Sequence, residues 1–248
     1  MMAMPTDNLP TRLLRAANWA PLPVMFFASV LLALPAASLA TRMMLGRLGV
    51  NPAEILLRQP GSWSLELLLL VLSVGPLRQA LVMLSCWHRA PFGKRLSDWN
   101  WLVRLRRPIG LAAFFYALLH VSVYALLDLD GDWQEWLNDL RDKRHIAAGT
   151  ASLLLLVPLA LTSTAAAVRL LKRYWKRLHL LVYPAALLAL LHFVLLSKPG
   201  VVAPLVHAVL LAGLLCCSGW QRLFRSHPLM QADGSVPERS GTPPAASS

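Results

Sequence analysis

The sequence predicts an all-α membrane protein in which six transmembrane helices form a bundle and both the N- and the C-terminus are cytoplasmic. Two properties of the 248 residues lead to this fold class. First, 56% of the residues are hydrophobic and only 15% are charged, whereas about a quarter of the residues in a soluble domain are charged. Second, the apolar residues gather in long runs. A chain of this length is expected to form one domain.

Six windows are apolar over about 20 residues, the length that a helix needs to cross a bilayer. They are 20–40, 60–77, 108–127, 146–162, 178–197 and 201–220. The second window is weaker because it carries Glu66, and the fourth because Pro158 interrupts it. The first window ends in "AASLA", which resembles a signal-peptide cleavage site, but its apolar core is longer than that of a signal peptide. We interpret it as a retained helix; a cleaved start would leave five spans.

The basic residues predict the orientation of these helices. With a cytoplasmic N-terminus, 17 of the 24 Lys and Arg residues fall in cytoplasmic segments, as the positive-inside rule requires. The loop 128–145, which holds six of the twelve acidic residues, then lies outside. We therefore expect a cytoplasmic segment at 1–19, the helical domain at 20–220 and a cytoplasmic tail at 221–248. The tail is polar and rich in proline and serine, which is typical of disorder.

Other features of the sequence are explained by the membrane. The net charge of +12 would suggest nucleic-acid binding in a soluble protein, but here the basic residues lie between apolar runs. Segment 86–107 mixes tryptophan with arginine, which predicts a stretch lying along the inner interface. Cys86, Cys216 and Cys217 form no recognisable framework. The sequence also shows no internal repeat, no Walker loop and no Rossmann glycine pattern.

Four of the seven histidines have ordinary interpretations. His88 and His227 lie in polar, basic stretches, which favours exposure to solvent. His145 lies at the outer mouth of the fourth predicted helix, where a surface histidine is expected. His207 falls in the sixth helix, and we interpret it as a polar contact between helices.

His120, His179 and His192 lie within predicted spans, where ionisable side chains are costly and usually functional. At 1.5 Å per residue, His120 lies about 18 Å along the third helix and His192 about 21 Å along the fifth, so the two imidazoles meet at one level. His179 lies about 20 Å below His192, near the inner edge. On an ideal helix these two would point about 140° apart, and only a kink at Pro184 or a π-bulge would bring them to one face.

Two neutral imidazoles at one depth, among aromatic and aliphatic residues, suit a haem iron, which takes one axial ligand from each side. Zinc would need three or four ligands, and no Asp, Glu or Cys lies at this level in the two helices. We expect His120 and His192 to be the axial ligands of a haem, with His179 as a candidate ligand at a second site. A rival class is a small transporter or channel whose histidines bind protons or metal ions, with Glu66 as an acidic partner. A haem-binding anchor that only docks a partner is a further alternative.

Several motifs resemble one family, in matching order from about residue 50 to 200. They are "NPAE" at 51–54, "PLR" at 76–78, "GLAAFFYALLHVSVY" at 110–124, "PLALTST" at 158–164 and "WKRLHLLVYPAALLALLHFVLLSK" at 175–198. Together they resemble the haem-binding membrane subunits of bacterial methionine-sulfoxide reductase systems, within the ferric-reductase-like transmembrane family.

The resemblance implies a multi-pass protein of the bacterial inner membrane that binds haem b, with FMN also associated. It implies an electron-transfer subunit rather than a catalytic one. Electrons would pass from the quinone pool or a cytoplasmic flavin reductase to a periplasmic molybdopterin enzyme of the MsrP type, its partner in a heterodimer, which repairs oxidised periplasmic proteins. The family's histidines match His120, His179 and His192. Relatives with two haems carry another histidine near the position of Arg106, and arginine is a poor iron ligand. The site around His179 is therefore a candidate site for a second haem with an unusual second ligand, for a flavin or for a quinone.

Overall fold

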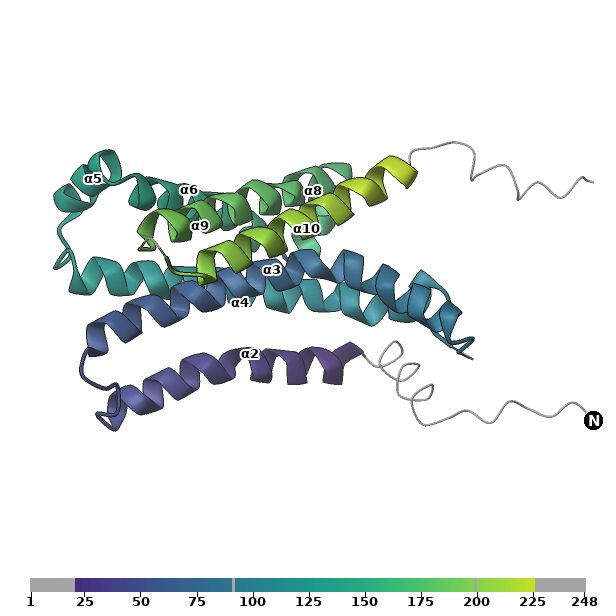
Figure 1. The fold of residues 1–248 in the computed structure, drawn as a ribbon, viewed down its shortest axis with the longest axis horizontal. Helices are drawn as coiled ribbons and strands as arrows, with labels where there is room; N and C mark the ends of the chain where they lie inside the picture. The colour runs from purple at the N-terminus through teal and green to yellow at the C-terminus, as the bar shows by residue number, and fades with distance from the viewer. Residues whose placement is uncertain (1–20, 91, 199, 226–248) are drawn as a thin grey trace, which may run out of the picture.

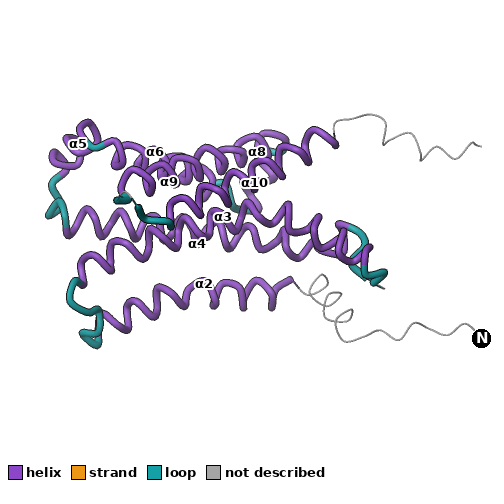
Figure 2. The backbone as a smooth tube through the Cα atoms, viewed as in Figure 1, coloured by secondary structure: helices purple, strands orange, loops and turns teal. Residues whose placement is uncertain are grey.

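The structure is a computed structural model that describes residues 21–90, 92–198 and 200–225. The predicted N-terminal segment 1–19, most of the predicted tail 221–248 and His227 lie outside the described residues. Within the described ranges the chain is helical, with turns and short loops and no strand, as Figure 2 shows.

Long helices run side by side and alternate in direction (Figure 1). Their bounds are Pro21–Met44 for α2, Pro52–Trp87 for α3, Asn100–Leu127 for α4, Trp133–Asp142 for α5, Arg144–Leu161 for α6, Ala165–Leu171 for α7, Arg173–Leu178 for α8, Val182–Leu196 for α9 and Ala203–Arg225 for α10. Two 3₁₀ turns, Leu96–Trp99 and His179–Leu181, precede α4 and α9.

The helical spans agree with the six apolar windows of the sequence. Within the described residues, α2, α3, α4, α6 and the run from α8 to α9 are long and apolar enough to cross a membrane. Helix α10 adds a shorter apolar stretch, Ala203–Gly219. Each predicted window falls on one of these six helices, which confirms the all-α membrane fold. We call the end of the bundle that carries α5 the α5 end, and the opposite end, where α3 turns into α4, the α3–α4 end (Figure 1).

Two antiparallel helix pairs, α3 with α4 and α6 with α9, form the centre of the bundle. One buried cluster joins them: Leu68 of α3, Ala113 of α4, Leu156 and Leu159 of α6, and Ala185 of α9. Ala113 and Ala185 are completely buried, so the helices approach closely at these small side chains. Helix α10 packs against α3 and α9 beside this cluster.

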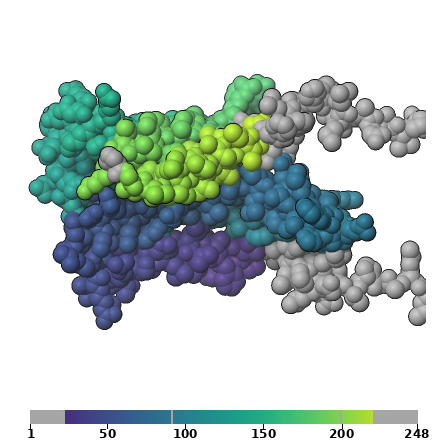
Figure 3. Space-filling model, in the orientation of Figure 1, coloured from purple at the N-terminus to yellow at the C-terminus, as the bar shows by residue number. Residues whose placement is uncertain are grey.

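Helix α2 lies against α4 at the edge of the bundle. The Tyr116 hydroxyl of α4 donates a hydrogen bond to the Leu32 carbonyl at 2.6 Å and accepts one from the Ala36 N–H at 3.2 Å. Leu32, Ala36 and Tyr116 also line a groove of about 500 Å³ between the two helices, and α2 forms the outer edge of the bundle in Figure 3. The first window therefore forms a helix that contacts the domain through a specific side chain.

Segment 86–107, expected to lie along the inner interface, consists of two helix ends and the turn between them, and its place at the interface stays a prediction. Its first residues end α3, and its last eight, from Asn100 on, form the first two turns of α4. Between them a turn is held by the Asp98 carboxylate, which accepts hydrogen bonds from the backbone N–H groups of Gly93 and Arg95, each at 3.1 Å. Tryptophan and arginine occur together here because the ends of α3 and α4 extend beyond the apolar parts of these helices.

Helix α5, within the acidic loop 128–145, is fastened to its neighbours through Asp139. This carboxylate is nearly buried and accepts a hydrogen bond from Lys143 Nζ at 2.7 Å and another from the Tyr124 hydroxyl of α4. These two hydrogen bonds, that from Lys143 being the larger effect, hold the pKa of Asp139 below its usual range. The carboxylate therefore stays ionised at neutral pH and joins α5 to α4.

Candidate functional site

His120 of α4 and His192 of α9 face each other across the centre of the bundle. Their ring centroids are 5.9 Å apart and the ring planes are inclined by 74°. One ring comes from the α3–α4 pair and the other from the α6–α9 pair. The expectation that these two imidazoles meet at one level is confirmed.

Backbone carbonyls on the partner helices fix the proton of each ring. His120 Nδ1 lies 2.8 Å from the Leu57 carbonyl oxygen of α3, and His192 Nδ1 lies 2.6 Å from the His145 carbonyl oxygen of α6. A carbonyl can only accept a hydrogen bond, so in each neutral ring Nδ1 carries the proton. Nε2, on the edge of the ring away from the carbonyl, is then left with its lone pair free to bind a metal ion.

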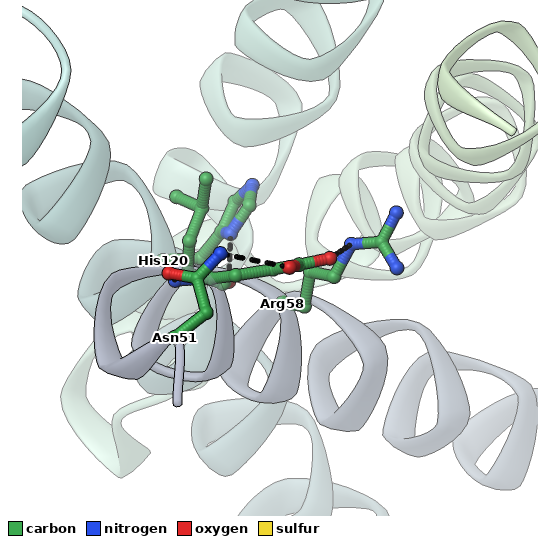
Figure 4. A network of polar contacts seen from close by, with 5 residues as sticks. Asn51, Arg58 and His120 are labelled. Atoms are coloured by element: carbon green, nitrogen blue, oxygen red, sulfur yellow. Dashed lines mark hydrogen bonds and ion pairs between the residues drawn. The ribbon is translucent and has the colours of Figure 1, made fainter. Parts of the chain in front are cut away.

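Polar contacts among Asn51, Glu54 and Arg58 stabilise the start of α3, the part of the helix that contains Leu57 (Figure 4). The Asn51 side chain caps the helix by accepting from the Glu54 N–H at 3.3 Å, and it donates to the Glu54 carboxylate at 3.0 Å. Glu54 in turn forms an ion pair with Arg58 at 3.3 Å. Capping and these side-chain contacts stabilise the turn that contains Leu57.

Glycines allow both rings to lie close to the neighbouring helix. A Cβ atom at Gly61 of α3 would lie 3.0 Å from His120 Nδ1, and one at Gly149 of α6 would lie 2.8 Å from His192 Nδ1. Real Cβ atoms are rarely found this close to other heavy atoms, so a larger residue would displace the ring. Neither glycine was expected from the sequence to contribute to the site.

The spacing of the two rings fits one metal ion held between them. Metal–imidazole bonds are about 2 Å long and each nitrogen lies about 1 Å from its ring centre, so rings sharing one ion have centroids about 6 Å apart. The observed 5.9 Å agrees with this value. The donor set, two neutral imidazoles among apolar side chains, is that of a haem iron with two axial histidines. That these residues bind iron stays a prediction.

Two other histidines differ in their relation to this pair. The ring of His145, expected to be an ordinary surface residue, lies 6.0 Å from that of His192, and its carbonyl holds His192 in place. His207 of α10 stands apart: its Nδ1 lies 2.7 Å from the Ala203 carbonyl of its own helix, and its ring contacts Phe193.

His179 lies towards the α3–α4 end of the bundle. Its ring lies against that of Trp175, with centroids 4.0 Å apart, and its Nδ1 is 3.2 Å from the Trp175 carbonyl. The helix is interrupted here by the three-residue 3₁₀ turn His179–Leu181, rather than by a π-bulge or a kink at Pro184. A 3₁₀ turn adds about 20° per residue relative to an α-helix, which reduces the angle between His179 and His192 from about 140° to about 80°.

The described residues do not assemble the alternative sites. No group of three or more His, Cys, Asp or Glu side chains within them is placed to hold a metal ion. Glu66, the acid expected in a proton relay, has an exposed side chain on α3. Among the described residues, the His120–His192 pair is therefore the arrangement whose spacing suits the binding of a metal ion.

Comparison with known proteins identifies the family of the chain. Residues 61–190 match the family described as the ferric reductase like transmembrane component. The chain is 39% identical over 198 residues, 80% of each chain, to the protein-methionine-sulfoxide reductase heme-binding subunit MsrQ of Xanthomonas axonopodis pv. citri. It is 38% identical over 214 residues to the protein of the same name from Azospira oryzae, covering 86% of this chain and 82% of that one. The chain therefore belongs to the MsrQ family, within the ferric-reductase-like transmembrane proteins.

Proposed function

We propose that the chain is a haem b subunit that transfers electrons through the bacterial inner membrane to a methionine-sulfoxide reductase. The observation that carries this proposal is the pair His120 and His192, whose rings lie 5.9 Å apart with both Nδ1 atoms hydrogen-bonded to carbonyls. The relatives support it, because their names describe heme-binding subunits of a protein-methionine-sulfoxide reductase.

In this proposal His120 and His192 would hold the haem through Nε2, the nitrogen left free by the hydrogen bonds at Nδ1. The bound haem supplies a one-electron centre that alternates between the ferric and ferrous states. The carbonyls of Leu57 and His145 keep each imidazole neutral, correctly oriented and more basic. The buried cluster that contains Ala113 and Ala185 excludes water from the centre of the bundle below the pair.

The distribution of basic residues supports a direction for electron transfer. With the N-terminus cytoplasmic, the α5 end faces the periplasm, and His120 and His192 lie in the half of the bundle nearer to it. A periplasmic acceptor of the MsrP type, bound as the second subunit of a heterodimer, would then lie near the haem. The donor, the quinone pool or a cytoplasmic flavin reductase, would deliver electrons from the membrane or from the α3–α4 end. His179 at that end is the candidate residue for a second site, whether for haem, FMN or quinone.

Haem binding can be tested on the purified full-length protein in detergent. We expect Soret and α-band absorption that shifts on reduction with dithionite. His120→Ala and His192→Ala should each abolish this absorption, because losing one of the two iron–imidazole bonds weakens haem binding so far that the purified protein loses the haem. His207→Ala is the matched control, since its ring bonds within α10, and it should keep the haem. Full haem content in His192→Ala would reject the ligand assignment, and a colourless wild-type protein after haem-sufficient expression would favour a transporter.

A second measurement separates an electron carrier from a haem-binding anchor. The reduced protein is mixed with a purified periplasmic reductase of the MsrP type in a stopped-flow spectrometer, and reoxidation of the haem is followed by its α-band. An electron carrier is reoxidised when the reductase and a methionine sulfoxide substrate are present together. A protein that only docks its partner keeps its reduced spectrum.

A further inference from the structure

The two helix pairs carry the same short sequence motifs. Gly-x-x-Ser-Leu occurs at 61–65 in α3 and again at 149–153 in α6. Ala-x-x-x-Ala-Leu-Leu-His occurs at 113–120 in α4 and again at 185–192 in α9. The expectation of a chain without internal repeats is therefore wrong for these helices.

The repeated residues also make the same contacts. Ser64 Oγ donates to the Ala113 carbonyl at 2.9 Å, and Ser152 Oγ donates to the Ala185 carbonyl at 2.8 Å. Each of these carbonyls belongs to the alanine seven residues before a site histidine, on the same face of its helix. The serines therefore fix the axial register between each histidine-bearing helix and its partner helix.

The carbonyls that hold the histidine rings occupy equivalent places as well. In each pair the carbonyl belongs to residue i of the first helix, the glycine to i+4 and the serine to i+7, all on one face. The three atoms nearest to an added Cβ at Gly61 all belong to the His120 ring, and at Gly149 all belong to the His192 ring. Glycines that only let helix backbones approach each other would have backbone or mixed neighbours instead.

We propose that the glycine and the carbonyl one turn before it form a positioning device, used twice, that sets the orientation and the basicity of the two haem ligands. The inference rests on the proposed function, because it assigns positioning residues to the ligands named there. Because Gly61 and Gly149 have no side chain, each ring lies close enough to the neighbouring helix for its Nδ1–H to bond to the carbonyl of Leu57 or His145. This hydrogen bond gives the ring partial imidazolate character, which favours ferric over ferrous iron and lowers the midpoint potential. The serine contact keeps the two helices in register.

The test compares four glycine-to-alanine variants of the full chain. Gly61→Ala and Gly149→Ala place a methyl group against a ligand ring. Gly110→Ala in α4, where the nearest atom would be a Val71 methyl at 3.9 Å, and Gly213→Ala in α10, where nothing lies within 4 Å, are the controls. For each variant we measure haem retention, the midpoint potential by redox titration and the electron paramagnetic resonance spectrum of the ferric protein.

In the two site variants we expect a higher midpoint potential and altered ferric g-values, because the ring turns and its hydrogen bond lengthens. Haem affinity should fall by about 10-fold to 100-fold, as when other partners of metal ligands are removed. The effect should be larger in Gly149→Ala than in Gly61→Ala, since the new methyl would be 2.8 Å rather than 3.0 Å from Nδ1. Both controls should match the wild type in all three measurements.

Serine variants keep the proposal testable if a glycine variant does not fold. Ser64→Ala and Ser152→Ala remove a hydroxyl without adding volume and should shift the same spectrum and potential in the same direction, by less. The positioning role would be overturned if haem-loaded Gly149→Ala kept the wild-type g-values and midpoint potential. If Gly149→Ala does not fold, wild-type values in both serine variants would overturn it. Either result would leave the proposed function intact. Full haem in His192→Ala would instead overturn the proposed function itself.

Discussion

Replacing Tyr116 with phenylalanine should loosen α2 without disturbing the packing of α4. The ring of Tyr116 packs edge to face against those of Trp63 and Phe115, and phenylalanine keeps these contacts. Only the hydroxyl is lost, and with it the hydrogen bonds to the Leu32 carbonyl and the Ala36 N–H of α2. The two backbone groups lie four residues apart, so the hydroxyl contacts a single turn of α2.

The size of the effect follows from these two contacts. Hydrogen bonds between helices within a membrane contribute on average about 0.6 kcal/mol each, and those in soluble proteins about 1 kcal/mol. Removing both should therefore weaken the docking of α2 by about 1–2 kcal/mol. The undocked population would rise by about 5-fold to 30-fold.

Hydrogen exchange of the protein in detergent measures this population directly. Amides in the middle of α2 should exchange about 5-fold to 30-fold faster in Tyr116→Phe, while those of α10 keep their rate. Tyr174→Phe is the control, because that residue is exposed and its hydroxyl accepts a hydrogen bond from the neighbouring Arg173. Unchanged exchange in α2 would refute the docking role of Tyr116. An intact mass that lacks the first 40 residues would show that α2 is cleaved and is not part of the mature domain.

Three further predictions concern other parts of the bundle. His179→Ala should keep the haem held by His120 and His192 and remove only a second chromophore, measured as the cofactor-to-protein ratio; loss of the main Soret band would contradict this. The pKa of Asp139 is lowered in the folded protein, so its contribution to the docking of α5 is present above about pH 4 and is lost as the pH falls further. Tryptophan fluorescence of α5 against pH should show this, and a midpoint above pH 4 would argue against the assignment. Gly93→Ala should lower the melting temperature, because its φ is +91° and a Cβ would lie 2.8 Å from Ser85 Oγ, whereas Gly46→Ala, with open space around it, should lower it less.

The helices and the shared level of His120 and His192 could be predicted from the sequence. Both depend on quantities that a single helix carries in its own residues: the length of an apolar run and a rise of 1.5 Å per residue. The same arithmetic was insufficient for His179, because its angular position depends on the 3₁₀ turn His179–Leu181. Nothing in the composition of that segment distinguishes a 3₁₀ turn from a continued α-helix.

The residues that hold the histidine rings could not be predicted in the same way. Leu57 contributes a backbone carbonyl, so its side chain carries no signal, and a glycine such as Gly61 shows its role only beside the ring that it accommodates. The place of His145 at a helix end predicts a surface residue, although its carbonyl bonds to His192. The available signal was the repeated Gly-x-x-Ser-Leu, which is short and occurs in α3 and α6, far apart in the sequence.

The repeated device also indicates how haem binding and folding are coupled. Each helix pair supplies one imidazole together with the carbonyl and glycine that position it, so each half of the site is complete within its own pair. The iron would then be the element that joins the halves, in addition to the buried contacts around Leu68 and Leu156. A ligand that binds only the assembled state stabilises that state. Loss of the haem should therefore loosen the contact between the α3–α4 and α6–α9 pairs before it disturbs the helices within either pair.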